Sequence, residues 1–132
     1  MLGIIALIIV FLGIFISQKQ GEQKGDKEIT VQIVVEGDEV YNNTVNTDAT
    51  TLADLLLEMK ENQDIQLEYE TTSCGMYIKS MENYNEDPTN GKYWTYNSEN
   101  NASCVENNFC DGADLLNIGD GDIFVFSLEA YE

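Results

Sequence analysis

The pattern of apolar and polar positions divides the chain into an apolar start, a short polar stretch and a long alternating remainder. No residue from Met1 to Ile16 carries a polar side chain. A membrane-spanning helix needs about 20 apolar residues, and the apolar core of an export signal is shorter. We therefore expect residues 1–17 to be a transmembrane anchor or a signal segment, and residues 18–28 to be a polar linker.

The pattern beyond the linker predicts a β-hairpin followed by a helix. Residues 29–35 and 40–45 alternate apolar and polar side chains on either side of a turn at residues 36–39, which is typical of paired strands. Capping residues at 48–51 precede a helix predicted over residues 52–60. One face of this helix is apolar and must pack against a sheet. The residues of that face are Leu52, Leu55, Leu56 and Met59.

The second half of the chain contains the signals of further strands. Alternation and aromatic or β-branched side chains predict strands over residues 65–70, 76–81, 92–96 and 123–128. Residues 97–108 are polar, and we expect them to form a loop without a second helix. The order of hairpin, helix and further strands predicts an α+β fold. A helix that crosses the sheet directly after a hairpin favours a β-grasp, with one domain over residues 29–132.

Charge is concentrated in this domain and is strongly negative. The whole chain has a formal net charge of −18. Residues 1–27 hold three Lys, one Glu and one Asp, a sum of +1, so residues 28–132 carry −19. Such a surface repels phosphate backbones, and we therefore expect no nucleic-acid partner. The simplest interpretation of the charge is a solvated outer surface.

Composition also argues against catalysis and against a resident metal. The chain contains no His, which excludes Ser-His-Asp and Cys-His catalysis and His-bearing zinc sites. Four acidic residues near the C-terminus do not have the spacing of an EF-hand calcium loop. They are Asp111, Asp114, Asp120 and Asp122. We therefore expect a protein that is not an enzyme, with no catalytic residues and no metal site.

Three cysteines leave the disulfide pairing open. Cys104 and Cys110 close a short loop and form the favoured pair. A bridge from Cys74 to either of them, or three free thiols, is the alternative. A domain exported to an oxidising compartment favours one disulfide and one leftover thiol.

Three segments, taken in order, resemble a known family. They are residues 75–81, the aromatic strand at 91–97 with its Tyr-Trp-x-Tyr pattern, and residues 112–126, which end in Gly-Asp and an alternating apolar strand. Following a hairpin and a leucine-rich helix, they are similar to the transcobalamin C-terminal-like domain of bacterial surface proteins. The similarity covers most of residues 29–128 and implies a β-grasp fold. The family usually has Asn-Gly after the aromatic strand, whereas this chain has Asn97-Ser98 and then an insertion with two cysteines.

The resemblance implies ligand binding. In the cobalamin carriers of this family the equivalent domain covers one face of cobalamin, so cobalamin or another corrinoid is the expected ligand. Aromatic faces and backbone groups suit a large, amide-edged ligand of this kind. The expected ligand-binding residues are Tyr77, Tyr84, Trp94 and Tyr96. A structural role is the alternative for each, and strand alternation puts Trp94 and Tyr96 on one face.

Together these features predict a binding module outside the cell. We expect a single-pass cell-membrane protein with an extracellular domain, or a secreted protein if residues 1–17 are removed. Three Lys follow the apolar segment, so a cytoplasmic domain is the alternative under the positive-inside rule. The expected partners are a corrinoid or other small-molecule ligand and a membrane transporter or surface protein. The competing hypothesis is a structural or adhesive surface domain that binds no small molecule.

Overall fold

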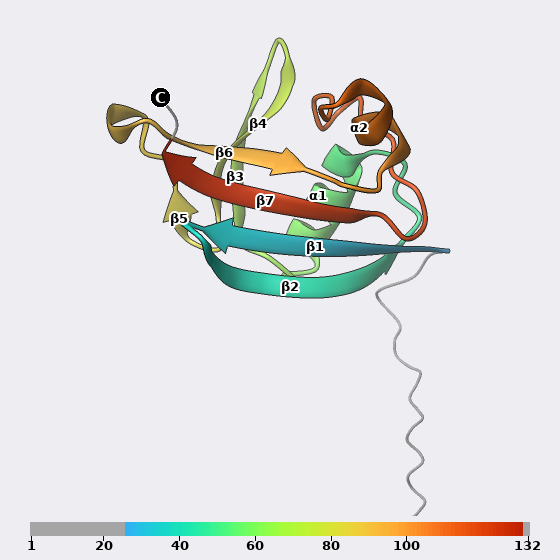
Figure 1. Ribbon diagram of the computed structural model, residues 1–132. Coiled ribbons are helices and arrows are strands. Elements are labelled where there is room, and N and C mark those ends of the chain that lie inside the picture. Colours follow the sequence, from blue (N-terminus) through green and yellow to red (C-terminus); the bar gives the residue numbers. More distant parts are fainter. Residues whose placement is uncertain (1–25, 131–132) are drawn as a thin grey trace, which may run out of the picture.

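The computed structural model describes residues 26–130 (Figure 1). The expected anchor or signal over residues 1–17 lies outside the described residues, as does the linker up to residue 25. Within residues 26–130, no helix combines the length and the apolar character needed to cross a membrane. The first strand begins at Lys27, slightly before the predicted start at Ile29.

A four-stranded sheet forms the main layer, with the strand order β2-β1-β7-β6. Its strands are β1 (Lys27–Val35), β2 (Asp38–Thr47), β6 (Lys92–Asn97) and β7 (Ile123–Ala130). The central strands β1 and β7 run parallel, and the two outer pairs run antiparallel. The predicted hairpin is confirmed, and the two residues of its turn, Glu36 and Gly37, both have positive φ, as tight hairpin turns require.

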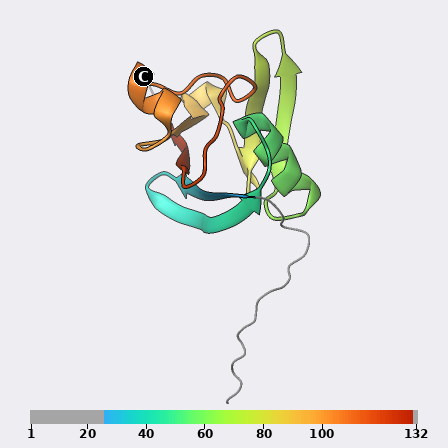
Figure 2. The ribbon, with the colours of Figure 1, turned by 90° about the vertical axis from the view of Figure 1, so that its right-hand side faces the viewer.

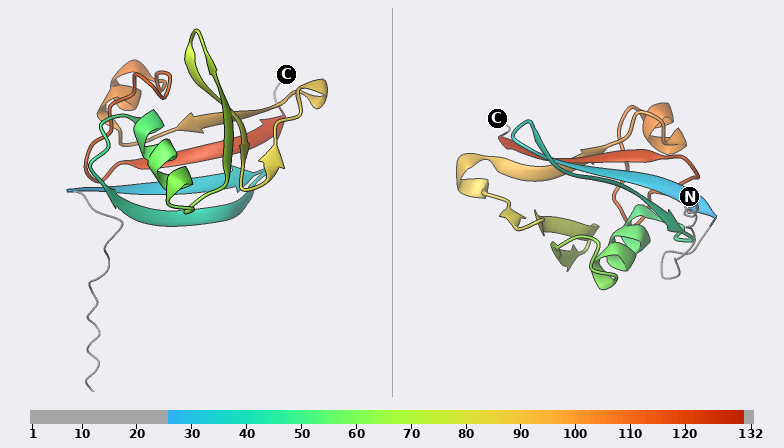
Figure 3. Two further views of the ribbon diagram at one scale, coloured as in Figure 1. Left: turned by 180° about the vertical axis from the view of Figure 1, so that it is seen from behind. Right: turned by 90° about the horizontal axis from the view of Figure 1, so that it is seen from below.

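A second layer covers one side of this sheet (Figure 3, right). It consists of the helix α1 (Leu52–Glu61) and a three-stranded sheet of β3 (Leu67–Thr72), β4 (Gly75–Met81) and β5 (Tyr84–Asn85). The tip of the β3–β4 hairpin projects beyond the rest of the domain (Figures 1 and 2). A 3₁₀ helix (Pro88–Asn90) leads from β5 into β6. The architecture is α+β, as predicted.

The hydrophobic core lies between the two layers. Alternate side chains of β1 and β7 point toward α1 and are fully buried; they are Ile29, Val31, Ile33, Phe124 and Phe126. The apolar face of α1 packs in the same cluster, and Leu52, Leu55 and Leu56 have no exposed surface. Full burial of one such side chain contributes about 1.5–3 kcal/mol. The prediction that the leucine face packs against the sheet is confirmed.

The start of α1 is held by the segment that precedes β7. The Thr51 hydroxyl accepts a hydrogen bond from the backbone N–H of Asp54 at 3.2 Å. The first N–H groups of a helix have no partner inside it. Here those of Leu52 and Ala53 donate to the carbonyls of Leu116 (2.9 Å) and Ala113 (3.0 Å). The long connection between β6 and β7 is therefore attached to the helix.

One local prediction was wrong, and one predicted strand is shifted by two residues. The expected loop at residues 97–108 contains a second helix, α2 (Ala102–Asn107). Asn101 caps this helix, because its Oδ1 accepts hydrogen bonds from the N–H groups of Ser103 and Cys104 at 3.0 Å. Six residues are too few to display a helical period, so the helix depends on its cap. The strand expected at residues 65–70 lies further along, as β3, where it pairs with β4.

Candidate functional site

The middle of the outer face of the four-stranded sheet, opposite the core, is polar and uncharged, and Glu28, Glu39 and Glu129 lie around it on the same face. Cross-strand pairing places Asn42, Gln32, Val125 and Asn97 in one row, and Val34, Ser127 and Thr95 in the next. Side chains of a strand alternate between the two faces, so these residues point away from the core. In a chain with a net charge of −18, this surface differs from the rest.

A hollow opens on this face, where β1, β6 and β7 meet the segment before α2. We call it the outer-face hollow. Its volume is about 760 Å³, within the range of small-molecule sites. The lining residues used below are Gln32, Thr95, Asn97, Asn100, Ile123 and Val125. Glu99 is the one charged side chain among the described residues that line it.

The rim of the outer-face hollow is fixed by two asparagines. Asn100 Oδ1 accepts a hydrogen bond from the Ile123 N–H (2.9 Å), and its Nδ2 donates to the Gly121 carbonyl (3.0 Å). The Asn100 amide thus pairs with a backbone N–H and a backbone carbonyl to which a neighbouring strand would otherwise bind. Asn101 Nδ2 donates to the buried carboxylate of Asp122 at 2.6 Å, a charge-assisted bond that offsets the loss of hydration. The hollow is therefore preformed.

The lining is suited to binding a neutral molecule. The amides of Gln32 and Asn97 can donate and accept hydrogen bonds, and Ile123 and Val125 supply an aliphatic floor. Across residues 26–130, no three or more His, Cys, Asp or Glu side chains are grouped so as to hold a metal ion. The arrangement fits a ligand with an apolar face and a polar, uncharged edge.

Two of the residues predicted to bind ligand, Trp94 and Tyr84, meet at the other side of the sheet. Trp94 is half-buried on the inward face of β6, and its Nε1 donates to the Tyr84 carbonyl at 3.0 Å. This contact joins β6 to β5. The Tyr84 side chain is exposed and lines a smaller hollow of about 420 Å³, together with the charged residues Glu36, Asp87 and Lys92. Tyr84 is thus accessible to a ligand, although in more charged surroundings.

Tyr96 shares the inward face of β6 with Trp94, as predicted. Its hydroxyl donates to the Asp111 carbonyl at 2.8 Å, and its ring lies tilted against Phe126 with centroids 5.6 Å apart. Burial, together with the negative charges of Asp111 and Asp114, raises the pKa of Tyr96 to about 12. Tyr96 therefore ties the segment after the disulfide to the core, and it also contributes to the lining of the outer-face hollow.

Tyr77 is exposed on β4 and donates its hydroxyl hydrogen to the Glu86 carboxylate. That hydrogen bond raises the pKa of Tyr77 to about 12. The structure therefore places Tyr77 and Tyr84 on the paired strands β4 and β5 of one sheet, and Trp94 and Tyr96 on β6 of the other. Their role in ligand binding stays a prediction.

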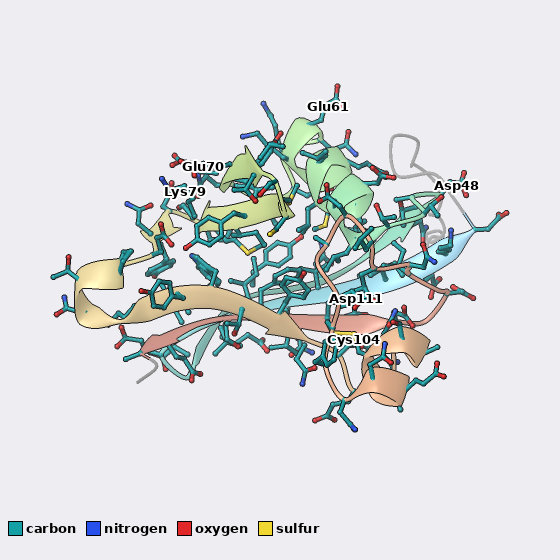
Figure 4. The ribbon with its side chains drawn as sticks, turned by 90° about the horizontal axis from the view of Figure 1, so that it is seen from above. Asp48, Glu61, Glu70, Lys79, Cys104 and Asp111 are labelled. Atoms are coloured by element: carbon teal, nitrogen blue, oxygen red, sulfur yellow. A yellow bond between two sulfur atoms is a disulfide. The ribbon has the colours of Figure 1, made fainter. Side chains whose placement is uncertain are left out.

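Cys104 and Cys110 form a disulfide, the pairing that the sequence favours. Cys104 is the buried residue of α2, and Figure 4 labels it together with Asp111 on the segment that follows the bridge. The bridge closes the insertion against the end of β6. Cys74 is an exposed free thiol between β3 and β4.

Of the residues that line the outer-face hollow, Tyr96 is the one that was predicted from the sequence to bind ligand. A signal for others was present, because the outward positions of three predicted strands are neutral in an otherwise acidic chain; they include Gln32, Thr95 and Val125. The pattern of one strand cannot reveal which other strands lie beside it. The hollow appears only when β1, β7 and β6 are placed in order.

No protein-family model and no curated protein matches the chain. Solved structures do match it. A protein from Ruminococcus gnavus ATCC 29149 that has been proposed to bind metal is 20% identical, with a TM-score of 0.63 over 81% of this chain and 100% of that chain. Haptocorrin in complex with Cbi is 22% identical, with a TM-score of 0.55 over 80% of this chain and 26% of that one. At these identities the likeness shows a shared fold, and it includes a transcobalamin-family protein.

Proposed function

We propose that this chain is a binding module that holds a large, neutral ligand in the outer-face hollow. The observation that carries the proposal is the contrast between a preformed hollow, whose described lining has Glu99 as its one charged side chain, and a chain whose net charge is −18. Desolvation of neutral amides and hydroxyls costs less than desolvation of carboxylates, so a neutral ligand fits this surface best.

A corrinoid is the ligand class to test first. Cobalamin combines an apolar face with amide edges, which matches the aliphatic floor and the amide side chains of the hollow. The fold is shared with haptocorrin, whose structure contains Cbi. The strand order β2-β1-β7-β6 with a helix after the hairpin supports assignment to the β-grasp and to the transcobalamin-like domains. This chain spans about a quarter of haptocorrin, so it would act as an accessory that passes its ligand to a membrane transporter or surface protein.

The domain would work outside the cell, tethered by residues 1–17 or released after their removal. The Cys104–Cys110 disulfide supports this location, because disulfides persist in oxidising compartments. Protease added to intact cells should remove the acidic domain. If the domain is cut only after lysis, the orientation is reversed.

Equilibrium dialysis of the full chain in detergent micelles against cyanocobalamin tests the ligand. We expect saturable binding with one ligand per chain and a Kd below about 1 mM. Val125→Glu places a carboxylate on the floor of the hollow and should weaken binding at least about tenfold. Asn46→Glu is the matched control. Asn46 is an exposed residue of β2 that lies on the same face of the sheet as Val125 but does not line the hollow.

Two results of this experiment would count against the proposal. Absence of saturable binding by the unsubstituted chain would remove corrinoids from consideration. Binding that survives Val125→Glu and is lost in Tyr84→Ala would move the site to the hollow at β5.

A structural or adhesive surface domain is the second candidate. It is favoured by three exposed apolar side chains near the insertion, Val105, Phe109 and Leu115, with 54%, 59% and 76% of their surface exposed. Exposed apolar side chains of this kind often mark contacts with other proteins. Replacement of all three by Ser should then reduce adhesion of cells that display the chain, with no effect on cobalamin binding. Unchanged adhesion would discard this candidate.

A further inference from the structure

β2 is an unpaired edge of the four-stranded sheet. It pairs with β1 along one side, and no other described strand pairs with it. Figure 1 shows β2 at the lower border of the sheet, with no described element beyond it. A long edge strand presents a row of backbone N–H and C=O groups to which another strand can bind.

The direction of these backbone groups follows from the register. The N–H of Thr30 donates to the carbonyl of Asp122 at 3.0 Å, on the β7 side. Thr30 faces Thr44 across the hairpin, so this is a pair without mutual hydrogen bonds, and the N–H and C=O of Thr44 point away from β1. By alternation, those of Asn42 and Asn46 do the same. The N–H of Thr44 meanwhile donates to the side chain of Asn43 at 3.0 Å, a local bond that a partner strand can replace.

Beyond the bulge at Val40, where the β1–β2 register shifts, the edge has none of the usual protection against pairing. Soluble proteins place Lys, Pro or inward-pointing charges on exposed edge strands. Residues 40–47 contain no charged residue and no Pro, although the chain carries a net charge of −18. Acidic residues stand at both ends instead, with Asp38 and Glu39 before this stretch and Asp48 after it. The outcome is a neutral strand with anionic ends.

We propose that β2 binds an extended segment of another protein as a fifth strand of the sheet, and that this segment has an uncharged, β-forming centre with Lys or Arg at both ends. The charge pattern selects this partner, because its basic ends meet the acidic ends of β2. A second copy of this chain fits poorly. Antiparallel pairing of two β2 strands about Thr44 would set Asp48 of one copy opposite Val40 of the other, one position from Glu39, so the acidic ends of the two strands would meet and repel each other.

The test measures binding of fluorescent decapeptides to the full chain in detergent micelles by fluorescence anisotropy. The probe is KKTVTVTVKK, and its controls are EETVTVTVEE and KKTVPVTVKK. We expect the probe to bind saturably and more weakly as salt rises. Both controls should bind at least about tenfold more weakly, the first through repulsion and the second because proline removes a ladder donor.

Two variants at one position isolate the backbone contribution. Thr44→Pro removes an outward N–H that β1 does not use, and it should reduce probe affinity at least about tenfold. Thr44→Val keeps that N–H and should bind as the unsubstituted chain does. Circular dichroism and the thermal transition show whether Thr44→Pro stays folded. If it does not, Asp38→Asn with Glu39→Gln and Asp48→Asn supplies the second test, in which probe affinity and its salt dependence should both fall.

Three outcomes would overturn the proposal. The first is equal binding of the probe by folded Thr44→Pro, because the peptide would then be held by acidic surface elsewhere. The second is unchanged affinity and salt dependence in the triple variant. The third is a dimer in sedimentation that Thr44→Pro abolishes, since the edge would then be occupied by a second copy. Cobalamin binding is measured separately, and no residue of β2 lines the outer-face hollow, so failure of one proposal leaves the other standing.

Discussion

The two faces of the four-stranded sheet are built from the same strands and do different work. The inner face of β1 and β7 is aliphatic and aromatic, fully buried, and packed against the leucine face of α1. The outer face of the same strands is polar, is uncharged between Glu28 and Glu129, and opens into a hollow. Stability is concentrated on one face, so the other is free to carry a ligand. Neighbouring residues such as Val125 and Phe126 therefore have separate roles.

The largest expected effect is on the inner face. Phe126→Ala should lower the free energy of unfolding by about 3–5 kcal/mol, because it leaves a cavity beneath α1. Val125→Ala, the adjacent residue on the other face, should lower it by less than about 1 kcal/mol. Urea unfolding followed by Trp94 fluorescence measures both. If both substitutions lowered the free energy of unfolding equally, stability would not be concentrated on the inner face.

The next effect concerns the insertion beside the outer face. Cys104→Ser combined with Cys110→Ser should lower the free energy of unfolding by about 2 kcal/mol, since the bridge closes a short loop. Thermal unfolding with and without reductant measures the same contribution in the unsubstituted chain. Cys74→Ser is the control and should change neither, because its thiol is exposed and unbridged.

Tyr96 connects the two faces, and its loss should have an intermediate effect. Tyr96→Phe removes the hydrogen bond to the Asp111 carbonyl, at a cost of about 1 kcal/mol. The pKa of Tyr96 is raised to about 12 by burial, above the usual value near 10. The folded state therefore favours the neutral phenol, and this contribution is full below pH 10 and is lost as pH rises toward 12.

Unfolding measurements between pH 9 and pH 12 check this sign. The unsubstituted chain should lose stability across that range, and Tyr96→Phe should lose less of it. A steeper loss in Tyr96→Phe would contradict the assignment.

The smallest effect on stability is expected within the hollow itself. Gln32→Ala should change the free energy of unfolding by no more than about 0.5 kcal/mol. If the outer-face hollow holds the ligand, the same substitution should weaken cobalamin binding about fivefold by removing one hydrogen bond. Parallel urea unfolding and dialysis measure the two quantities. A loss of stability without a loss of affinity would show that Gln32 stabilises the fold and does not bind the ligand.

The inner face could be predicted from the sequence because burial of one face spaces the apolar residues regularly along the chain. The spacing of Leu52, Leu55 and Leu56 and the alternation of residues 29–35 both record which side meets the core. The hairpin, α1 and β7 followed from these signals. The cap at Asn101 and the helix behind it left no period, since α2 is short. The outer-face hollow could not be predicted, because it forms only when β7 lies between β1 and β6. The sequence of one strand does not show which strands lie beside it.

The parallel pairing of β1 with β7 has a consequence for biosynthesis. The first and last strands of the domain are neighbours at the centre of the sheet, so the sheet is incomplete until the final residues have been made. Contacts between distant parts of a chain form slowly. A domain connected in this way completes its four-stranded sheet only after its last strand has been made, so its folding follows the synthesis of the whole domain.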